Sequence, residues 1–474
     1  MPITSQLVFS TIVVCLSSSF MMGYNLAIIN LPSENIKKFM KRMIPSLDVE
    51  FAYSLTSVYF IIGAAIGSFS CGFIADKLGR RNGLHINTVI GLVGAVFAGI
   101  CSFISNVYVL FIGRFISGLN AGITIGVASM YLLEIAPTDI RGLIGACHQL
   151  FVTIGILLSY VMTINQLLNT YERWAYGIML GSIFHFIGLL LLPFCPESAR
   201  YLYIIKRDED RAKSEYMRIT GADSADSFIR EMNEEALKVN EEPEFKIVHL
   251  FTKKEYRKAT AIAILIQVLQ QLSGINAVIA NSSSMFATAK VDPKYLEYFV
   301  VGLGLLNVVA TIIVLPLIEK AGRRALLLWP TLVLAGTLLA QTIIVTMVRS
   351  LAPEKQPPLA ILAVSVVFVY TICFAIGLGP IPAMIVAEIF RQGPRTAAYS
   401  VSQCVQWLCN LLVLATFPSL NKVMGGFVYL PYLVVVVLCW TFFFFLMPET
   451  KNKSFDEIAK ELEHGSVFAR SRSN

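Results

Sequence analysis

Twelve apolar stretches, each long enough to cross the roughly 30 Å hydrocarbon core of a bilayer as a helix, constrain this chain most strongly. Hydrophobic residues make up 56% of the sequence and charged residues only 15%, against about 25% charge in soluble domains. The sequence therefore predicts an all-α membrane protein with twelve transmembrane helices. The predicted spans are 7–30, 52–75, 84–105, 108–133, 142–167, 174–194, 257–288, 297–318, 325–348, 359–388, 396–419 and 425–447.

The spans fall into two sets of six, separated by a segment rich in both acidic and basic residues. Local patterns recur between the sets: GRR at 79–81 returns at 322–324, and PES at 196–198 returns as PET at 448–450. Two similar six-helix halves are typical of transporters that rock around a central site. We expect an N-terminal half at 1–196, a cytoplasmic linker of short helices at 197–256, a C-terminal half at 257–447 and a cytoplasmic tail at 448–474.

The positions of basic residues predict the orientation. Arg80, Arg141, Arg323 and Arg395 all fall in loops that connect an even span to the next odd one. By the positive-inside rule these loops and both termini face the cytoplasm, although the loop at 31–51, placed outside, also carries several lysines. The formal net charge of +7 thus reflects topology, and we expect no nucleic-acid partner.

An amide cluster interrupts the seventh span. Gln267, Gln270 and Gln271 lie within about 100° of one another on an ideal helix, so they share a face. Asn276 would lie on the opposite face of a straight helix, so it joins the glutamines only if the helix breaks. We expect such a break at Ser273 and Gly274. Neutral amides are suited to a neutral, hydroxylated ligand. The alternative is that they join helices through interhelical hydrogen bonds.

Acidic and basic side chains meet at the cytoplasmic ends of spans 2, 4, 8 and 10. Such groups can form ion pairs that close the inner face and break when it opens, which biases one of two states. The alternative is positive-inside charge alone. The predicted gate residues are Asp76, Arg80, Arg81, Glu134, Arg141, Glu319, Arg323, Arg324, Glu388 and Arg395.

The tenth span contains GLGPIP at 377–382, where Gly377, Pro380 and Pro382 weaken the helix. This segment is a hinge or an unwound binding segment, and the alternative is a purely structural kink.

The sequence shows no candidate catalytic residues in its spans. No nucleophile–base pair, metal-ligand cluster or phosphate-binding loop is visible in the spans, and the nine cysteines include no C-x-x-C pair. Arg114 and His185 are the obvious ionisable residues at depth, and no carboxylate lies near mid-membrane. We predict no enzymatic activity, no metal and no cofactor, and the missing acid argues against proton coupling.

The motifs QQLSGIN, GRR twice, PESAR, GPIP, AEIFRQGPR and PETKNKSFDEI occur in this order along nearly the whole chain. Together they resemble the sugar porters of the major facilitator superfamily, and most closely the animal facilitative hexose transporters. The resemblance implies a major facilitator fold and transport of a monosaccharide such as glucose or fructose. It implies sugar contacts from Gln149, Gln267, Gln270, Gln271, Asn276, Asn307 and Asn410. It also places Ala383 and Gln406, where members of the family differ, among the predicted substrate-binding residues.

The resemblance also bears on coupling. Proton-coupled relatives carry an aspartate at the site of Asn25, paired with the arginine at Arg114. Because Asn25 cannot titrate, a uniporter is favoured. A proton-coupled sugar symporter and a transporter-like sugar sensor are the alternatives.

Four positions depart from the common family pattern. Ala383 follows GPIP where tryptophan is frequent, a feature shared with fructose-type members, and Ala375 replaces an expected acid. Ala280 and Asn281 replace paired tyrosines, which predicts an altered extracellular gate.

The expected partners are a small-molecule sugar and the lipid bilayer. The expected location is the plasma membrane, and a monomer suffices for transport.

Overall fold

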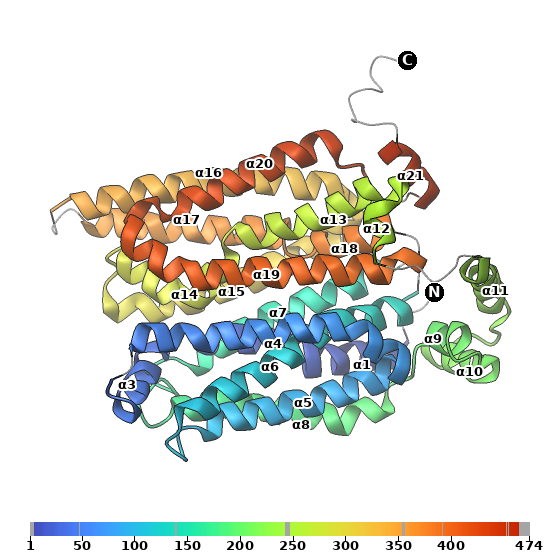
Figure 1. Ribbon diagram of the computed structural model, residues 1–474, viewed down its shortest axis with the longest axis horizontal. Coiled ribbons are helices and arrows are strands. Elements are labelled where there is room, and N and C mark those ends of the chain that lie inside the picture. Colours follow the sequence, from blue (N-terminus) through green and yellow to red (C-terminus); the bar gives the residue numbers. More distant parts are fainter. Residues whose placement is uncertain are drawn as a thin grey trace.

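The structure is a computed structural model that describes residues 4–46, 48–137, 140–241, 247–352, 356–390, 392–451, 453 and 455–463. Among these residues twelve helical segments are long and apolar enough to cross a membrane, as predicted. The helices run side by side in two bundles, one from each half of the chain (Figure 1). The N-terminal half, in blue and cyan, lies below the C-terminal half, in yellow to red.

The first span is not one regular helix. It consists of α1 (Ser5–Val14), a five-residue π-helix η1 (Cys15–Ser19) and α2 (Phe20–Ala27). Single π turns of this kind are rare and bend the helix that contains them. The other spans of this half are α4 (Val49–Leu78), α5 (Arg80–Ile100), α6 (Val107–Ile135), α7 (Arg141–Met162) and α8 (Trp174–Leu191), which continues into the short η3 (Leu192–Phe194).

Two spans of the C-terminal half are interrupted. The seventh consists of α13 (Lys254–Leu272) and α14 (Ile275–Thr288), and the tenth consists of α17 (Gln356–Ile376) and α18 (Ile381–Ile389). Both interruptions fall where the sequence predicted them. The remaining elements are α15 (Pro293–Ala321), α16 (Arg323–Ser350), α19 (Gln392–Met424), the 3₁₀ turn η5 (Gly425–Tyr429) and α20 (Leu430–Leu446).

Short helices from the linker and from the C-terminal tail gather at one end of the bundle (Figure 1). We name this the terminal end. The predicted helical linker provides α9 (Ala199–Ile204), α10 (Glu209–Thr220), α11 (Asp226–Glu241) and α12 (His249–Thr252), and the tail adds α21 (Phe455–Glu463). The opposite end carries α3 (Ser33–Met43), which the sequence analysis treated as a loop, and we name it the α3 end.

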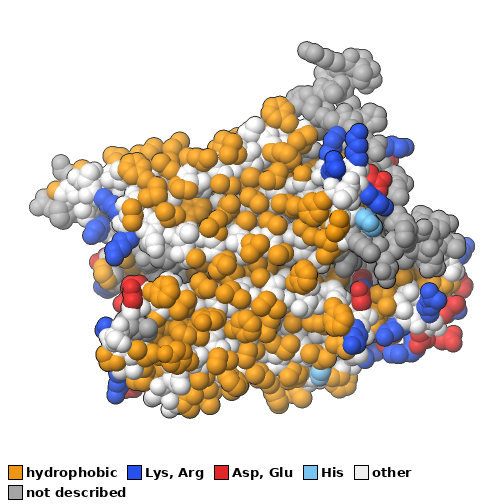
Figure 2. All heavy atoms as spheres, viewed as in Figure 1, with side chains coloured by type: hydrophobic (Ala, Val, Ile, Leu, Met, Phe, Trp, Pro, Cys, Tyr) orange, Lys and Arg blue, Asp and Glu red, His pale blue; other side chains and the backbone are white. Residues whose placement is uncertain are grey.

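The two halves pack against each other along helices. α4 packs against α19, and α7 packs against α15. In the first of these contacts Trp407 Nε1 donates a hydrogen bond of 2.7 Å to Ser68 Oγ. Hydrophobic side chains cover the face seen in Figure 2, and charged side chains gather at its two ends, as expected for a protein surrounded by lipid.

Candidate functional site

A chain of amide hydrogen bonds crosses the centre of the C-terminal half. Gln270 Nε2 donates to the carbonyl oxygens of Leu378 at 2.7 Å and Gly379 at 3.4 Å. Gln271 Nε2 donates to Gln270 Oε1 at 3.3 Å, and Asn276 Nδ2 donates to Gln271 Oε1. The break between α17 and α18 leaves carbonyls such as Leu378 O without an in-helix partner, and Gln270 occupies them. The amide chain therefore links the two interrupted spans.

The break in the seventh span brings Asn276 into this chain. Gly274 has φ +95°, a left-handed conformation that residues with a β-carbon rarely adopt. Tyr370 Oη donates to the Ser273 carbonyl at 3.0 Å, so a helix of another span supports the interruption. The expectation that Asn276 joins the glutamines only through a break at this place is confirmed.

Four amide oxygens near these spans are buried without a hydrogen-bond partner among the described residues. Leaving such an acceptor unpaired costs about 1–3 kcal/mol, so a ligand that donates a hydrogen bond to it recovers that cost. Three of them belong to predicted contacts, and Gln403 was missed although it lies on the same face of α19 as Asn410. The four atoms are Gln267 Oε1, Asn307 Oδ1, Gln403 Oε1 and Asn410 Oδ1, on side chains that are 1–6% exposed.

Gln149, Ala383 and Gln406 are the other predicted contacts. Gln149 on α7 places its amide nitrogen 3.5 Å from where a β-carbon on Gly379 would be, so it borders the same interruption that Gln270 contacts. Gln406 on α19 and Ala383 on α18 are half-buried, and in the described part of the chain no hydrogen bond joins either to the amide chain.

Arg114 lies deep in the N-terminal half and is 2% exposed. Its Nη1 donates to the main-chain carbonyl of Asn25 at 2.9 Å and its Nε to that of Thr56 at 3.3 Å. The guanidinium carbon lies 4.5 Å from the centre of the Phe60 ring. The Asn25 amide is turned back on its own helix and donates to Met21 O. Carbonyl dipoles and an aromatic face thus surround this cation, with no ion pair to a carboxylate among the described residues.

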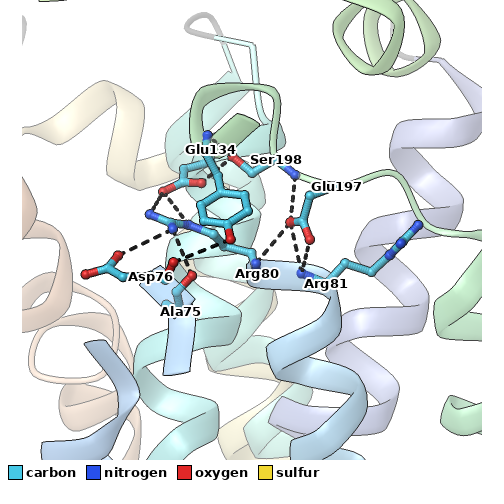
Figure 3. A network of polar contacts seen from close by, with 8 residues as sticks. Ala75, Asp76, Arg80, Arg81, Glu134, Glu197 and Ser198 are labelled. Atoms are coloured by element: carbon cyan, nitrogen blue, oxygen red, sulfur yellow. Dashed lines mark hydrogen bonds and ion pairs between the residues drawn. The ribbon is translucent and has the colours of Figure 1, made fainter. Parts of the chain in front are cut away.

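Arg80 is the centre of a polar network at the terminal end of the N-terminal half (Figure 3). It donates to Glu134 Oε1 from Nε at 3.1 Å and from Nη2 at 2.9 Å. Its Nη1 lies 3.6 Å from an Asp76 oxygen and donates to Ala75 O at 3.1 Å. Ser198 Oγ donates to the other oxygen of Glu134. One arginine therefore joins the ends of α4, α5 and α6 to the segment that precedes α9.

Glu197 completes this network from the main chain. Its carboxylate accepts hydrogen bonds from the backbone N–H groups of Arg80 at 3.0 Å, Arg81 at 3.0 Å and Ser198 at 2.9 Å. Burial raises the pKa of Glu197, although these N–H donors act in the opposite direction. Gly79 has φ +92°, and a β-carbon there would lie 2.6 Å from Glu197 Oε2. Only glycine allows the carboxylate to approach so closely.

The C-terminal half repeats the network with equivalent residues. Arg323 lies 3.1 Å from Glu388 Oε1, and Thr450 Oγ1 donates to Glu388 Oε2 at 2.5 Å. Glu449 accepts from the backbone N–H groups of Arg323 at 2.9 Å and Arg324 at 3.2 Å. The sequence analysis gave Glu197 and Glu449 no role, although the repeat of PES as PET contains both.

Two predicted gate arginines do not form the expected ion pairs. Among the described residues Arg81 Nη1 donates to Cys195 O at 3.4 Å, and Arg324 Nη2 donates to Phe444 O at 2.7 Å. Their backbone N–H groups, rather than their guanidinium groups, face the carboxylates of the network. The pairs Arg80–Glu134 and Arg323–Glu388, both between described residues, each lie inside one half.

The remaining predicted gate residues lie at the terminal end as well. Arg395 Nε donates to Phe390 O at 3.2 Å, just after α18 ends. Arg141 begins α7. Glu319 belongs to α15, and its side chain is outside the described part of the structure.

The sequence matches the family model described as "Sugar (and other) transporter" over residues 10–462. Facilitated glucose transporter member 3 of Ovis aries is 34% identical over 469 residues, which cover 97% of this chain and 93% of that protein. Facilitated glucose transporter member 1 of Gallus gallus is 35% identical over 459 residues, with 95% and 92% covered. A family of transporters confirms the expectation that the chain is not an enzyme.

Solved structures agree with the predicted major facilitator fold. The proton:xylose symporter XylE bound to 6-bromo-6-deoxy-D-glucose superposes with a TM-score of 0.79 at 23% identity, covering 97% of this chain and 99% of that one. The inward-open xylose transporter XylE from E. coli gives a TM-score of 0.75 at 24% identity, with 97% and 99% covered. The chain is a multi-pass membrane protein that belongs to the sugar transporter family, and it has the major facilitator fold.

Proposed function

We propose that this protein is a facilitative transporter that moves a monosaccharide, a hexose such as glucose or fructose, across a membrane by alternating access. The observation that carries the proposal is the set of buried amide oxygens that have no hydrogen-bond partner in the described part of the chain, including those of Gln267, Asn307 and Asn410. A sugar hydroxyl donates to such an oxygen and accepts from a neighbouring amide N–H. Relatives named facilitated glucose transporters support the choice of a hexose.

Binding in this site is expected to be weak. A carrier must release its cargo on the other side, which suits a dissociation constant in the millimolar range, or about −4 kcal/mol. The free-energy contributions of the amide contacts are not expected to be additive, because removing one amide leaves its buried partner without a hydrogen bond, which has a free-energy cost of its own.

Uniport is the favoured mode because Arg114 has no carboxylate partner among the described residues. The arginine donates to the main-chain carbonyl of Asn25, which holds no exchangeable proton. The alternative is proton-coupled symport, which the likeness to a proton:xylose symporter favours. That likeness concerns the fold, whereas the absence of an acid concerns the coupling residue itself.

The interrupted spans and the terminal networks are the proposed moving parts. The hydrogen bond from Gln270 to Leu378 O joins the interrupted seventh span to the interrupted tenth span, so a movement of one span around the sugar moves the other. At the terminal end the pairs Arg80–Glu134 and Arg323–Glu388 hold the helix ends of each half in the closed arrangement, and they break as that face opens.

The terminal end is proposed to face the cytoplasm, with the protein in the plasma membrane and a monomer sufficient for transport. The basic residues of the terminal networks support this orientation by the positive-inside rule.

Uptake of a panel of labelled sugars into liposomes that contain the purified chain tests the proposal. We expect saturable uptake of a hexose that is unchanged by an imposed proton gradient. Absence of uptake for every hexose would reject the function, and acidification of the lumen during uptake would assign a symporter instead.

A further inference from the structure

A cavity of about 390 Å³ lies between the two halves at the α3 end. Small-molecule sites have volumes of roughly 300–1,000 Å³, so this cavity has the size of a binding site. Its walls come from α3, α4 and the segment before α8 in one half, and from α14, α15 and α19 in the other. The three amide residues of that chain, Gln270, Gln271 and Asn276, are not part of its lining.

Hydrogen bonds between the halves separate this cavity from the amide chain. Asn30 Nδ2 donates to Ile279 O at 2.9 Å and to Ser282 Oγ at 2.8 Å, and Ser283 Oγ donates to Asn30 Oδ1 at 2.8 Å. Tyr160 Oη donates to the same Ile279 carbonyl at 2.7 Å. We name these five residues the polar latch. Along α14 the latch residues follow Asn276, and two members of the latch, Asn30 and Ser283, also line the cavity.

The lining of the cavity is dominated by neutral polar groups. Asn165, Asn169, Asn281, Ser54 and Ser57 all contribute to it. Amides and hydroxyls both donate and accept hydrogen bonds, which matches the hydroxyls of a sugar. α14 departs from helical geometry at Asn281, with φ −131° and ψ 17°, so the kink of this helix forms part of the wall.

Charged groups at the cavity mouth are acidic in balance. Lys37 Nζ lies 3.1 Å from Glu34 and 2.9 Å from Glu50, and it is the only basic residue of the lining among the described residues. Burial lowers the pKa of Lys37, but the hydrogen bonds to Glu50 and Glu34 outweigh it and raise that pKa, so the lysine stays charged. Glu297 adds a carboxylate that accepts from Asn165 N at 2.8 Å. This balance disfavours an anionic ligand such as a sugar phosphate.

We infer that this cavity is a second binding site for a neutral, hydroxylated solute, an outer site that holds the sugar before the polar latch opens. The inference rests on the proposed function and extends it, because it assigns a residue set outside the amide chain to recognition of the same cargo. The sugar passes from the outer site to the site formed by the buried amides when the hydrogen bonds from Asn30 and Tyr160 to α14 break.

A cysteine-protection experiment tests the outer site. Ser57→Cys places a thiol in the lining, and Gln166→Cys places one beside the rim, where Gln166 contacts Tyr298 outside the lining. Both variants are labelled in liposomes with a membrane-impermeant maleimide, with the wild-type protein as the blank for its native cysteines. We expect D-glucose to slow labelling of Ser57→Cys by about fivefold or more and that of Gln166→Cys by less than about twofold. Glucose 6-phosphate is expected to protect neither.

Equal protection at both positions would overturn the inference, since it would report a conformational change rather than occupancy. Unprotected Ser57→Cys in liposomes whose wild-type protein takes up D-glucose would also overturn it while leaving the proposed function intact. A second variant tests the kinetics: Ser57→Phe narrows the cavity and should raise the KM for entry from the α3 end by about fivefold, with the KM for exit unchanged. A rise in both KM values would count against an outer site.

Discussion

Replacing Gln267 with methionine separates binding from packing in the amide region. Gln267 is 1% exposed, and its Oε1 has no partner among the described residues. Methionine keeps the length of the side chain but removes the unpaired acceptor, whose burial costs about 1–3 kcal/mol. The free energy of unfolding should therefore stay equal or rise. Sugar loses one hydrogen-bond acceptor, and about 1.4 kcal/mol of lost binding raises the KM for uptake about tenfold.

Gln270→Met is the matched control, because Gln270 already has protein partners. Its loss strands Leu378 O, which now accepts at 2.7 Å, and removes the acceptor of Gln271. Stranding one buried carbonyl should lower the free energy of unfolding by about 1–3 kcal/mol, in addition to reducing uptake. The two glutamines thus differ in the sign of their effect on stability.

Zero-trans uptake in liposomes gives the KM of each variant, and thermal unfolding in detergent gives its Tm. A lower Tm for Gln267→Met together with an unchanged KM would refute the reasoning. That result would mean that Gln267 joins helices and does not meet the sugar.

Three further substitutions test other parts of the account. Asn25→Asp introduces a titratable carboxylate beside Arg114, and uptake, flat in the wild type, should become dependent on pH between about 5 and 8; a flat profile would exclude this site from coupling. Glu197→Gln removes the charge that accepts hydrogen bonds from three backbone N–H groups, so the free energy of unfolding should fall by about 1.5–3 kcal/mol and the Tm with it. An unchanged Tm would contradict the stabilising role of this network. Gly274→Ala forces φ +95° on a residue with a β-carbon and should cost about 1–2 kcal/mol. Gly336→Ala, at a helical site with nothing within 4 Å, is its control and should be neutral or stabilising, and equal losses of Tm would contradict the assigned strain.

The sequence predicted the spans and their breaks because both depend on local chemistry. Length and hydropathy define a membrane helix, and Gly274 and the GLGPIP segment disrupt one wherever they stand. The clustering of Gln270, Gln271 and Asn276 followed from helical periodicity combined with the break at Gly274.

Features that depend on tertiary packing were not predictable. Helix α3 is too polar to register as a span, and it forms because Ile36, Phe39 and Met40 pack into the N-terminal half. The bond from Gln270 to Leu378 joins residues far apart in the sequence, so no spacing rule shows it.

The terminal networks show the same limit. The charge pattern predicted ion pairs from both arginines of each GRR motif without separating them. Among the described residues Arg80 and Arg323 form the ion pairs, whereas Arg81 and Arg324 contact Glu197 and Glu449 through their backbone N–H groups. Whether Arg81 and Arg324 use the backbone or the side chain depends on where the fold places Glu197 and Glu449, which are far from these arginines in the sequence.

Counterflow of labelled D-glucose tests the central claim most directly. Liposomes that contain the purified chain are loaded with unlabelled D-glucose and diluted into a trace of the labelled sugar with no imposed proton gradient, in parallel samples with and without a protonophore. A facilitative carrier with a buried amide site predicts a transient accumulation of label inside, of equal size with and without the protonophore. Absence of this overshoot for D-glucose and D-fructose alike, or its loss when the protonophore is added, would contradict the account.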